Sequence, residues 1–258
     1  MVPHTEIRHA VRFPKESLRK HSQSESYFFI NEGGNEKKLR FHDYDSIYSR
    51  PGLYEQLFYE RLACDSPRQI ADSLANAIAG AGEAIEPQRV LDLGAGNGIS
   101  GEELKRHAIS RVVAVDIIAE ARDAAMRDRP GVYDDYLVAD MTTLAPEQER
   151  ELRDWRFTAL TTVAALGFDD IPAEAFFEAV NLIEEDGWLA FTIRTDFLSE
   201  DDTSGFARLI KRLLYGDLVE LHHIERYRHR LSIDGEPIFY FAVILRKRGH
   251  LDHKLLEG

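Results

Sequence analysis

From Arg89 onward, short apolar stretches alternate regularly with amphipathic ones. Five stretches have the length and the β-branched content of strands: "RVLDLG", "RVVAVDI", "YDDYLVADM", "RFTALTTVAAL" and "GWLAFTIRTDF". Each is followed by a segment with apolar residues at helical spacing: "GISGEELKRH", "AEARDAAMRD", "APEQERELRDW", "AEAFFEAVNLIEED" and "FARLIKRLLYG". This alternation predicts a parallel sheet with helices on both faces. The strands are almost continuously apolar, as expected when both faces of a sheet are covered.

The last part of the pattern differs from this repeat. Two β-rich stretches in "DLVELHHIERYRHRLSIDGEPIFYFAVILRKR" flank Asp234 and Gly235, which form a strong hairpin turn signal. No helix fits between these strands, so they must pair antiparallel. We therefore predict an α/β fold with a doubly wound, seven-stranded sheet, mostly parallel with a C-terminal antiparallel hairpin.

The residues before Arg89 have a different character. Residues 1–40 are polar and aperiodic, with a Gly-rich break at "NEGGNEKK", and we expect a loosely attached, flexible N-terminal extension. "GLYEQLFYERL" has helical spacing, and "SPRQIADSLANAIAG" carries a good N-cap in Ser66 and a proline in its first turn. The expected organisation is one domain over residues 41–248 that begins with a helical segment, 41–85, and a tail over 249–258.

Charge and cysteine content narrow the class of protein. The 258 residues carry 32 Lys and Arg against 45 Asp and Glu, a net charge of −13. Such an acidic chain is not expected to act mainly by gripping phosphate backbones, although a local basic patch remains compatible with it. Cys64 is the single cysteine, so no disulfide forms within the chain, as in a reducing cytosol. We expect no signal peptide, no membrane partner and a cytoplasmic location.

The loop after the first strand of the sheet carries the clearest chemistry. In "VLDLGAGNGISGEEL", Gly94, Gly96 and Gly98 alternate at the carboxyl end of that strand, where open α/β sheets bind ligands. A dinucleotide fingerprint read from Gly96 starts too late after the strand. Asp92 would repel a diphosphate but suits a cationic ligand such as S-adenosylmethionine, which carries an ammonium, a sulfonium and no phosphate. A glycine-rich turn that binds nothing is the third alternative.

Two further strand ends supply polar groups. Asp116 ends the second strand, where a carboxylate can accept hydrogen bonds from both hydroxyls of an adenosine ribose, in S-adenosylmethionine or in NAD. Asp140 ends the third strand and can accept from an adenine amine, beside the soft apolar face of Met141.

These motifs resemble a known family. "VLDLGAGNG", "VVAVDI" and "LVADM" resemble the first three cofactor motifs of class I S-adenosylmethionine-dependent methyltransferases, and the terminal hairpin resembles their reversed seventh strand. The resemblance covers about residues 44–248 and implies a Rossmann-like sheet. More narrowly, "YDSIYSRPGLYEQLFYERL" and "FYFAVILRK" are similar to small methyltransferase-domain proteins of the Williams–Beuren-region type.

The resemblance also implies roles for individual residues. The methionine portion of S-adenosyl-L-methionine would lie against Asp92, Gly94, Ala95, Gly96, Asn97 and Gly98. Asp116 with Ile117 would bind the ribose, Asp140 with Met141 the adenine, and Thr162 with Val163 would line the route to the methyl group. The tyrosine-rich stretch 44–54, beginning with Tyr44, would fold over the cofactor as a lid.

The catalytic residues are less well defined. Methyl transfer needs in-line attack by a nucleophile, and a general base only when the acceptor is protonated. Candidates near the strand ends are His42, Tyr44, Tyr48, Arg194, Asp196, Tyr227 and His229, each of which could instead serve packing or ion pairing. The segment "TTVAALGFDDIP" lacks the Asn/Asp-Pro-Pro-aromatic motif of enzymes that methylate nucleic-acid amines, and Cys64 precedes the cofactor motifs, which disfavours cytosine C5 chemistry.

Metal and anion binding are secondary alternatives. Asp169, Asp170 and Asp196 could hold a hard cation, but we expect no metal, and adjacent histidines at 222 and 223 would point to opposite faces of a strand. Strand alternation places Arg226, Arg228 and Arg230 on one face, which could meet an anionic substrate or simply balance the acidic surface.

The leading hypothesis is a methyltransferase that acts on a small molecule. A non-catalytic cofactor-binding module and a nucleic-acid or protein methyltransferase are alternatives, and an NAD-dependent oxidoreductase is disfavoured by Asp92 and the glycine spacing. The motifs all concern the cofactor, so the sequence names neither the acceptor nor the oligomeric state.

Overall fold

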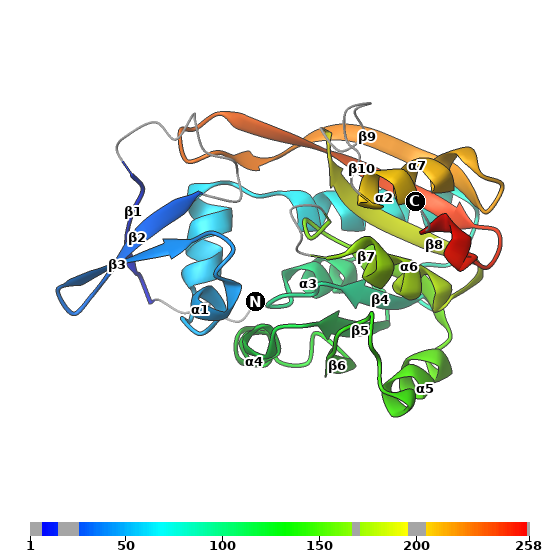
Figure 1. Ribbon diagram of the computed structural model, residues 1–258, viewed down its shortest axis with the longest axis horizontal. Coiled ribbons are helices and arrows are strands. Elements are labelled where there is room, and N and C mark those ends of the chain that lie inside the picture. Colours follow the sequence, from blue (N-terminus) through cyan, green and yellow to red (C-terminus); the bar gives the residue numbers. More distant parts are fainter. Residues whose placement is uncertain (1–6, 15–25, 167–170, 196–204, 257–258) are drawn as a thin grey trace.

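The computed structural model describes residues 7–14, 26–166, 171–195 and 205–256 (Figure 1). A seven-stranded sheet runs through its centre in the order β6-β5-β4-β7-β8-β10-β9. The strands are β4 (Arg89–Leu93), β5 (Arg111–Asp116), β6 (Asp135–Val138), β7 (Phe157–Thr162), β8 (Ile183–Arg194), β9 (Val219–Leu231) and β10 (Pro237–Lys247). From β6 to β8 all pairs are parallel, while β10 runs antiparallel to both β8 and β9. The predicted α/β fold with its terminal hairpin is confirmed.

Helices cover both faces of this sheet because successive strand residues point to opposite sides. Val90 and Val112 pack in one core with Leu74 of α2, and Leu91 packs in the other core with Phe176 of α6. The first face carries α2 (Ser66–Gly80), α3 (Ile99–Arg106) and α4 (Ala119–Asp128). The second carries α5 (Pro146–Asp154), α6 (Ala173–Asn181) and α7 (Gly205–Tyr215), with the short helix η4 (His253–Leu255) near the end of the chain.

One boundary differs from the sequence prediction. The helix expected through residue 186 ends at Asn181, and β8 begins at Ile183, which is buried and pairs with Phe157. The register between β7 and β8 then shifts, with a positive φ of 60° at Asp186. This irregular start depends on pairing with a distant strand, so helical spacing in the sequence conceals it.

The N-terminal region also differs from the expected loose extension. Within its described part, β1 (Ala10–Arg12), β2 (Tyr27–Glu32) and β3 (Asn35–Arg40) form a three-stranded antiparallel sheet. The hairpin between β2 and β3 turns at Gly33 and Gly34, both with positive φ. Phe28 and Ile30 on β2 are fully buried against Leu57, which anchors this small sheet to the helical segment that follows.

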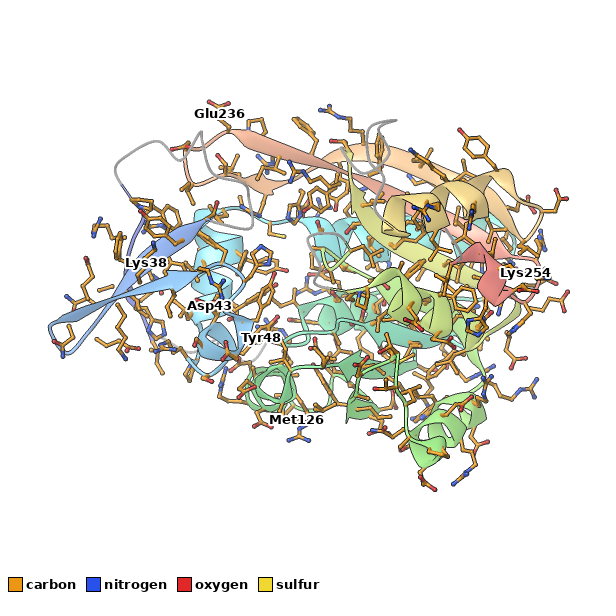
Figure 2. The ribbon with its side chains drawn as sticks, in the orientation of Figure 1. Lys38, Asp43, Tyr48, Met126, Glu236 and Lys254 are labelled. Atoms are coloured by element: carbon orange, nitrogen blue, oxygen red, sulfur yellow. The ribbon has the colours of Figure 1, made fainter. Side chains whose placement is uncertain are left out.

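That helical segment lies between the small sheet and the large one (Figure 1). It contains α1 (Tyr44–Tyr48) and η2 (Glu55–Arg61), a π-helix in place of the expected α-helix. Tyr48 packs against Ala121 and Ala124 of α4. Figure 2 shows Glu236, at the tip of the β9–β10 hairpin, toward the same end of the molecule as Lys38 of the small sheet. The large sheet and the N-terminal segment thus enclose the carboxyl ends of β4 and β5 between them.

Candidate functional site

The glycine loop after β4 adopts a conformation that only glycine takes readily. Gly94, Gly96 and Gly98 have φ angles of 70°, 55° and 90°, and Gly98 is the N-cap of α3. A Cβ on Gly94 would lie 2.9 Å from Ile171 Cδ1, and a Cβ on Gly96 would lie 2.5 Å from the Tyr48 hydroxyl. A side chain at any of these positions would strain the backbone, and at Gly94 and Gly96 it would also collide with a neighbouring side chain.

Asp92 lies beneath this loop and not in the cavity beside it. The side chain is 1% exposed, with Oδ1 accepting from Thr161 Oγ1 at 2.7 Å and Oδ2 from the Tyr133 hydroxyl at 2.7 Å. Burial raises its pKa to about 6. The ring of Tyr133 reaches Asp92 over Gly101, where a Cβ would approach the ring to 2.6 Å. Asp92 is therefore bonded to Tyr133 and Thr161 and does not line the cavity, and its expected role toward a cationic ligand stays a prediction.

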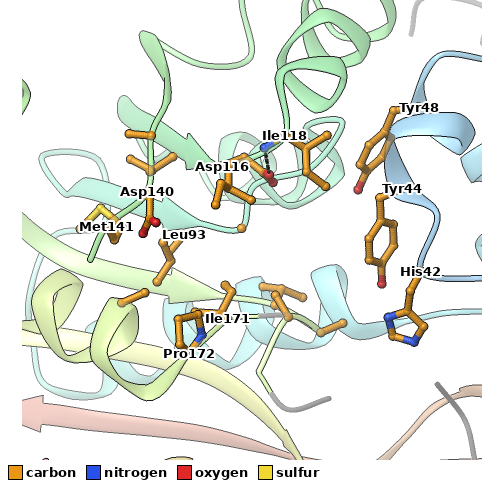
Figure 3. A pocket seen from close by; sticks show the side chains of 18 of the residues that line it. His42, Tyr44, Tyr48, Leu93, Asp116, Ile118, Asp140, Met141, Ile171 and Pro172 are labelled. Carbon is orange, nitrogen blue, oxygen red and sulfur yellow. Dashed lines mark hydrogen bonds between the residues drawn. The ribbon is translucent and has the colours of Figure 1, made fainter. Parts of the chain in front are cut away.

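Asp116 joins the glycine loop to the end of β5. Its Oδ2 accepts from the backbone N–H of Gly96 at 2.9 Å, and its Oδ1 accepts from the N–H of Ile118 at 2.9 Å (Figure 3). The residue is 8% exposed, and burial raises its pKa in spite of these bonds. Each carboxylate oxygen keeps a free lone pair, and the side chain lines the cavity in front of it.

A cavity of about 320 Å³ opens at the carboxyl ends of β4, β5 and β6. In Figure 3, Tyr44 and Tyr48 stand on one side of it and Met141 on the other, with Asp116 and Ile118 along the upper edge between them. Burial raises the pKa of Tyr48 well above its usual range, so the ring is a neutral wall. The complete lining is His42, Tyr44, Tyr48, Tyr54, Leu93, Gly94, Val115, Asp116, Ile117, Ile118, Ala139, Asp140, Met141, Val163, Ala164, Ala165, Ile171, Pro172 and Ala175.

A second, smaller cavity of about 70 Å³ adjoins the first. The two share His42, Tyr44, Tyr48, Tyr54, Gly94, Val163 and Ala164. Tyr44, Tyr48 and Tyr54 form a continuous aromatic lid over this junction, with ring centroids 6.0 Å and 5.0 Å apart in succession. The rest of the second cavity is lined by Phe41, Phe58, Tyr59, Cys64, Pro67, Ala95, Gly96, Asn97, Ile99, Ser100, Leu166, His229, Arg230 and Tyr240.

The buried thiol and imidazole of the second cavity are uncharged. Burial raises the pKa of the Cys64 thiol, so it is not a thiolate at neutral pH. Burial, with a smaller contribution from the Arg230 charge, lowers the pKa of His229 well below its usual value. His229 Nδ1 lies 2.7 Å from Ser66 Oγ, and its ring stacks on Tyr240 at a centroid distance of 4.1 Å.

A β-bulge gives β9 two consecutive side chains in this cavity. Ile238 of β10 pairs with Arg230 and Phe239 pairs with Arg228, so His229 is an extra residue in β9. His229 and Arg230 are therefore both buried, at 5% and 7% exposure, whereas Arg228 is exposed. The prediction that Arg230 shares a face with Arg226 and Arg228 is wrong because the extra residue reverses the alternation.

The bulge is also bonded to the segment that follows η2. The Asp65 N–H donates to the His229 carbonyl at 3.0 Å, and the Leu231 N–H donates to the Leu62 carbonyl at 2.7 Å. These backbone bonds lie on either side of Arg230 and hold residues 62–65 against the edge of the large sheet.

Comparison with known proteins identifies a domain within the chain. Residues 91–191 match the family described as "Methyltransferase domain". This range includes the glycine loop, Asp116 and the ends of β4, β5 and β6 at the first cavity. The chain carries a class I S-adenosylmethionine-dependent methyltransferase domain. This assignment confirms the methyltransferase activity and S-adenosyl-L-methionine as the cofactor, and it displaces the oxidoreductase alternative. The small-molecule acceptor stays a prediction. The narrower Williams–Beuren-region resemblance is not tested and stays a prediction.

Solved structures with low sequence identity share the fold of the methyltransferase. The N-methyltransferase NodS from Bradyrhizobium japonicum WM9, in complex with S-adenosyl-L-homocysteine, matches with a TM-score of 0.54 at 14% identity, over 81% of this chain and 98% of NodS. A SAM-dependent methyltransferase from Anabaena variabilis matches with a TM-score of 0.50 at 16% identity, over 81% of this chain and 96% of that one. A search of curated proteins found no match.

Most of the residues predicted from the sequence lie at the two cavities of the methyltransferase. The first cavity brings together His42, Tyr44, Tyr48, Gly94, Asp116, Ile117, Asp140, Met141 and Val163. The second is lined by Ala95, Gly96, Asn97 and His229, and again by His42, Tyr44 and Tyr48. Asp140 is exposed and accepts hydrogen bonds from the Thr142 N–H and hydroxyl, which lower its pKa.

Other predicted residues lie elsewhere. Those that line neither cavity are Asp92, Gly98, Thr162, Arg194 and Tyr227. Asp169, Asp170 and Asp196 lie outside the described residues. Over the described ranges, no three His, Cys, Asp or Glu side chains are grouped as a metal site, and no helix is long and apolar enough to cross a membrane.

The sequence analysis missed a buried ionic clamp beside the glycine loop. Arg129, whose side chain is 6% exposed, contacts Glu55 of η2 at 2.9 Å and Glu102 of α3 at 3.0 Å. Its guanidinium also donates to the Asn97 carbonyl at 3.1 Å, and the Asn97 side chain donates to Glu55 at 2.7 Å. The clamp fixes the π-helix, the loop and α3 to one another. Nothing in the local pattern around Arg129 distinguishes it from the neighbouring surface arginines.

Proposed function

We propose that the methyltransferase binds S-adenosyl-L-methionine in the first cavity and methylates a small molecule held in the second. The observation that carries the proposal is the junction of the two cavities beneath the aromatic lid, at Gly94, Val163 and Ala164. A methyl donor on one side of such a junction and an acceptor on the other would meet within one enclosed site.

The first cavity fits the cofactor by its chemistry. The two oxygens of Asp116 are held by backbone N–H groups and present free lone pairs, an arrangement that suits two neighbouring ribose hydroxyls. Met141 and Ile118 offer apolar faces for a purine ring. Gly94 lies at the junction of the two cavities and carries no side chain that would narrow it.

The second cavity fits a small acceptor better than a nucleic acid. Its volume of about 70 Å³ has room for several water molecules or for a compact acceptor. Aromatic rings close it from above, and the whole chain carries a net charge of −13. An extended polyanion would have to enter through the lid and against this charge.

The chain contributes mainly position and exclusion of water. Bound S-adenosyl-L-methionine supplies an activated methyl group on its sulfonium. The acceptor's bond to the methyl carbon would form as the carbon–sulfur bond breaks, the sulfur would keep that electron pair, and any proton on the acceptor would pass to solvent before or after enclosure. The aromatic lid, Gly94 and Val163 would hold the partners in line, and such positioning can lower a barrier by about 7–11 kcal/mol.

Calorimetric titration and an acceptor screen test the proposal. Wild-type protein should bind S-adenosyl-L-methionine and S-adenosyl-L-homocysteine but not NAD or NADP, and Asp116→Ala should weaken this binding by about tenfold or more. Asp123→Ala, which removes an exposed carboxylate on α4, is the matched control. Formation of S-adenosyl-L-homocysteine with small amines, phenols or thiols would support the acceptor class. Binding without turnover on any small acceptor, together with methylation of RNA or protein, would contradict it.

A further inference from the structure

Arg230 is a charged side chain in an unusual place. It is 7% exposed, it lines the second cavity, and the β9 bulge turns it away from the exposed arginines on the same strand. Burial lowers its pKa, but a guanidinium retains its proton at neutral pH because its ordinary pKa is above 12. The cavity therefore contains one full positive charge.

No carboxylate of the described chain neutralises this charge. Over the described ranges, no Asp or Glu lies within ion-pair distance of Arg230, and its guanidinium donates a single hydrogen bond, to the Leu231 carbonyl at 2.9 Å. The ionisable side chains with the largest effect on the pKa of Arg230 are, in order, Tyr240 and Cys64, followed by Tyr44 and Tyr54. None of them is a carboxylate, and burial raises the pKa of Cys64 and of Tyr54.

A buried and unpaired guanidinium is costly. Removing a cation from water without a partner carries a penalty of several kcal/mol, which proteins normally avoid by pairing the charge or by excluding it from the interior. The clamp at Arg129 shows the usual solution in this same chain, with two carboxylates on one buried guanidinium. At Arg230 four of the five N–H donors remain available on the cavity side.

We propose that the methyl acceptor carries an anionic group, a carboxylate or a phosphate, which binds the guanidinium of Arg230 in the second cavity. The planar fork of the guanidinium matches both groups in bidentate geometry. The rings of Phe58, Tyr59 and Tyr240 line the same cavity and would limit the water around a bound anion, which would strengthen the pair. This inference rests on the proposed function, since it assigns the second cavity to the acceptor.

The test compares charged and neutral probes on protein saturated with S-adenosyl-L-homocysteine. The probes are benzoate and its neutral amide, benzamide, with acetate and inorganic phosphate as smaller anions. The variants are Arg230→Met, which removes the charge at similar length, and Arg228→Met, an exposed control two residues away. We expect wild-type protein and Arg228→Met to bind benzoate or phosphate about tenfold or more tightly than benzamide, and Arg230→Met to lose this preference.

The unfolding midpoint of the probe-free protein provides an independent readout. Because no carboxylate of the described ranges pairs with Arg230, Arg230→Met should melt at the same temperature as wild-type or higher, and should bind S-adenosyl-L-homocysteine unchanged. A lower midpoint would show that the arginine stabilises the fold, and would overturn the inference. Equal affinity of wild-type protein for benzamide and for all three anions would also overturn it. Failure of wild-type protein to bind S-adenosyl-L-homocysteine would instead refute the proposed function.

The anion that binds most tightly indicates whether the acceptor carries a phosphate or a carboxylate. Preference for phosphate over both carboxylates assigns a phosphorylated acceptor, and preference for benzoate or acetate assigns a carboxylic acid. Loss of that preference in Arg230→Met is required in either case.

Discussion

Replacing Asp92 by asparagine should change how the stability of the protein depends on pH. In the native state the carboxyl is buried and has a pKa of about 6, against an ordinary value of 3.8. Between these two values the folded protein holds a proton that the unfolded chain has lost, so the free energy of unfolding falls as the pH rises. A shift of about two pKa units corresponds to about 3 kcal/mol of stability, present below pH 4 and lost by about pH 7.

The asparagine side chain fits the same position without titrating. Its carbonyl can accept from Thr161 Oγ1, and its amide can donate to the Tyr133 hydroxyl. The Tyr133 hydroxyl can in turn donate its own proton to the Ala95 carbonyl, which lies 3.4 Å away. Asp92→Asn should therefore fold, and its stability relative to wild-type should increase by about 3 kcal/mol between pH 4 and pH 7.

Urea unfolding at several pH values measures this difference directly. The fluorescence of the buried Trp188 reports on the large sheet, and other carboxyl groups titrate in both proteins and cancel in the comparison. Asp123→Asn is the control for the loss of one exposed charge. Stability profiles of wild-type and Asp92→Asn that run parallel across the range would refute the reasoning, because they would place an ordinary, solvated carboxyl at Asp92.

Three further substitutions test the packing of the loop. Gly96→Ala should reduce the calorimetric affinity for S-adenosyl-L-homocysteine by about tenfold or more, because a positive φ and the nearby Tyr48 hydroxyl both oppose a Cβ. Gly80 has open space around it, so Gly80→Ala should leave this affinity unchanged. Gly101→Ala should lower stability by about 1–3 kcal/mol in urea unfolding by displacing a buried ring; a neutral effect would contradict this packing. Arg129→Met should lower the free energy of unfolding by about 1–3 kcal/mol because it leaves the half-buried Glu55 with only the Asn97 amide as partner, and a loss under about 0.5 kcal/mol would show a solvated pair.

The large sheet could be predicted because its signals are local. Each strand and each helix carries its own periodicity, and the turn at Asp234 and Gly235 lies between two β-rich stretches. The same holds for the strand-end residues: Asp116 and Met141 line the cavity because the carboxyl ends of parallel strands meet at one edge of a sheet. These placements follow from the order of elements alone.

The placements that differ from prediction depend on distant partners. Asp92 is turned into the core by Tyr133, forty-one positions later in the chain. Arg230 is buried because one residue is added to β9 relative to β10, a feature that only the pairing of the two strands reveals. The small N-terminal sheet was missed because β3 is solvated on both faces and shows no apolar alternation.

The backbone bonds around the β9 bulge have a consequence for turnover. They fix residues 62–65 to the edge of the sheet, while Arg129 ties the π-helix to the glycine loop. Both ends of this segment are therefore anchored to the body that carries Arg230. An acceptor whose charge binds Arg230 would thus be placed relative to the glycine loop without rearrangement of this edge.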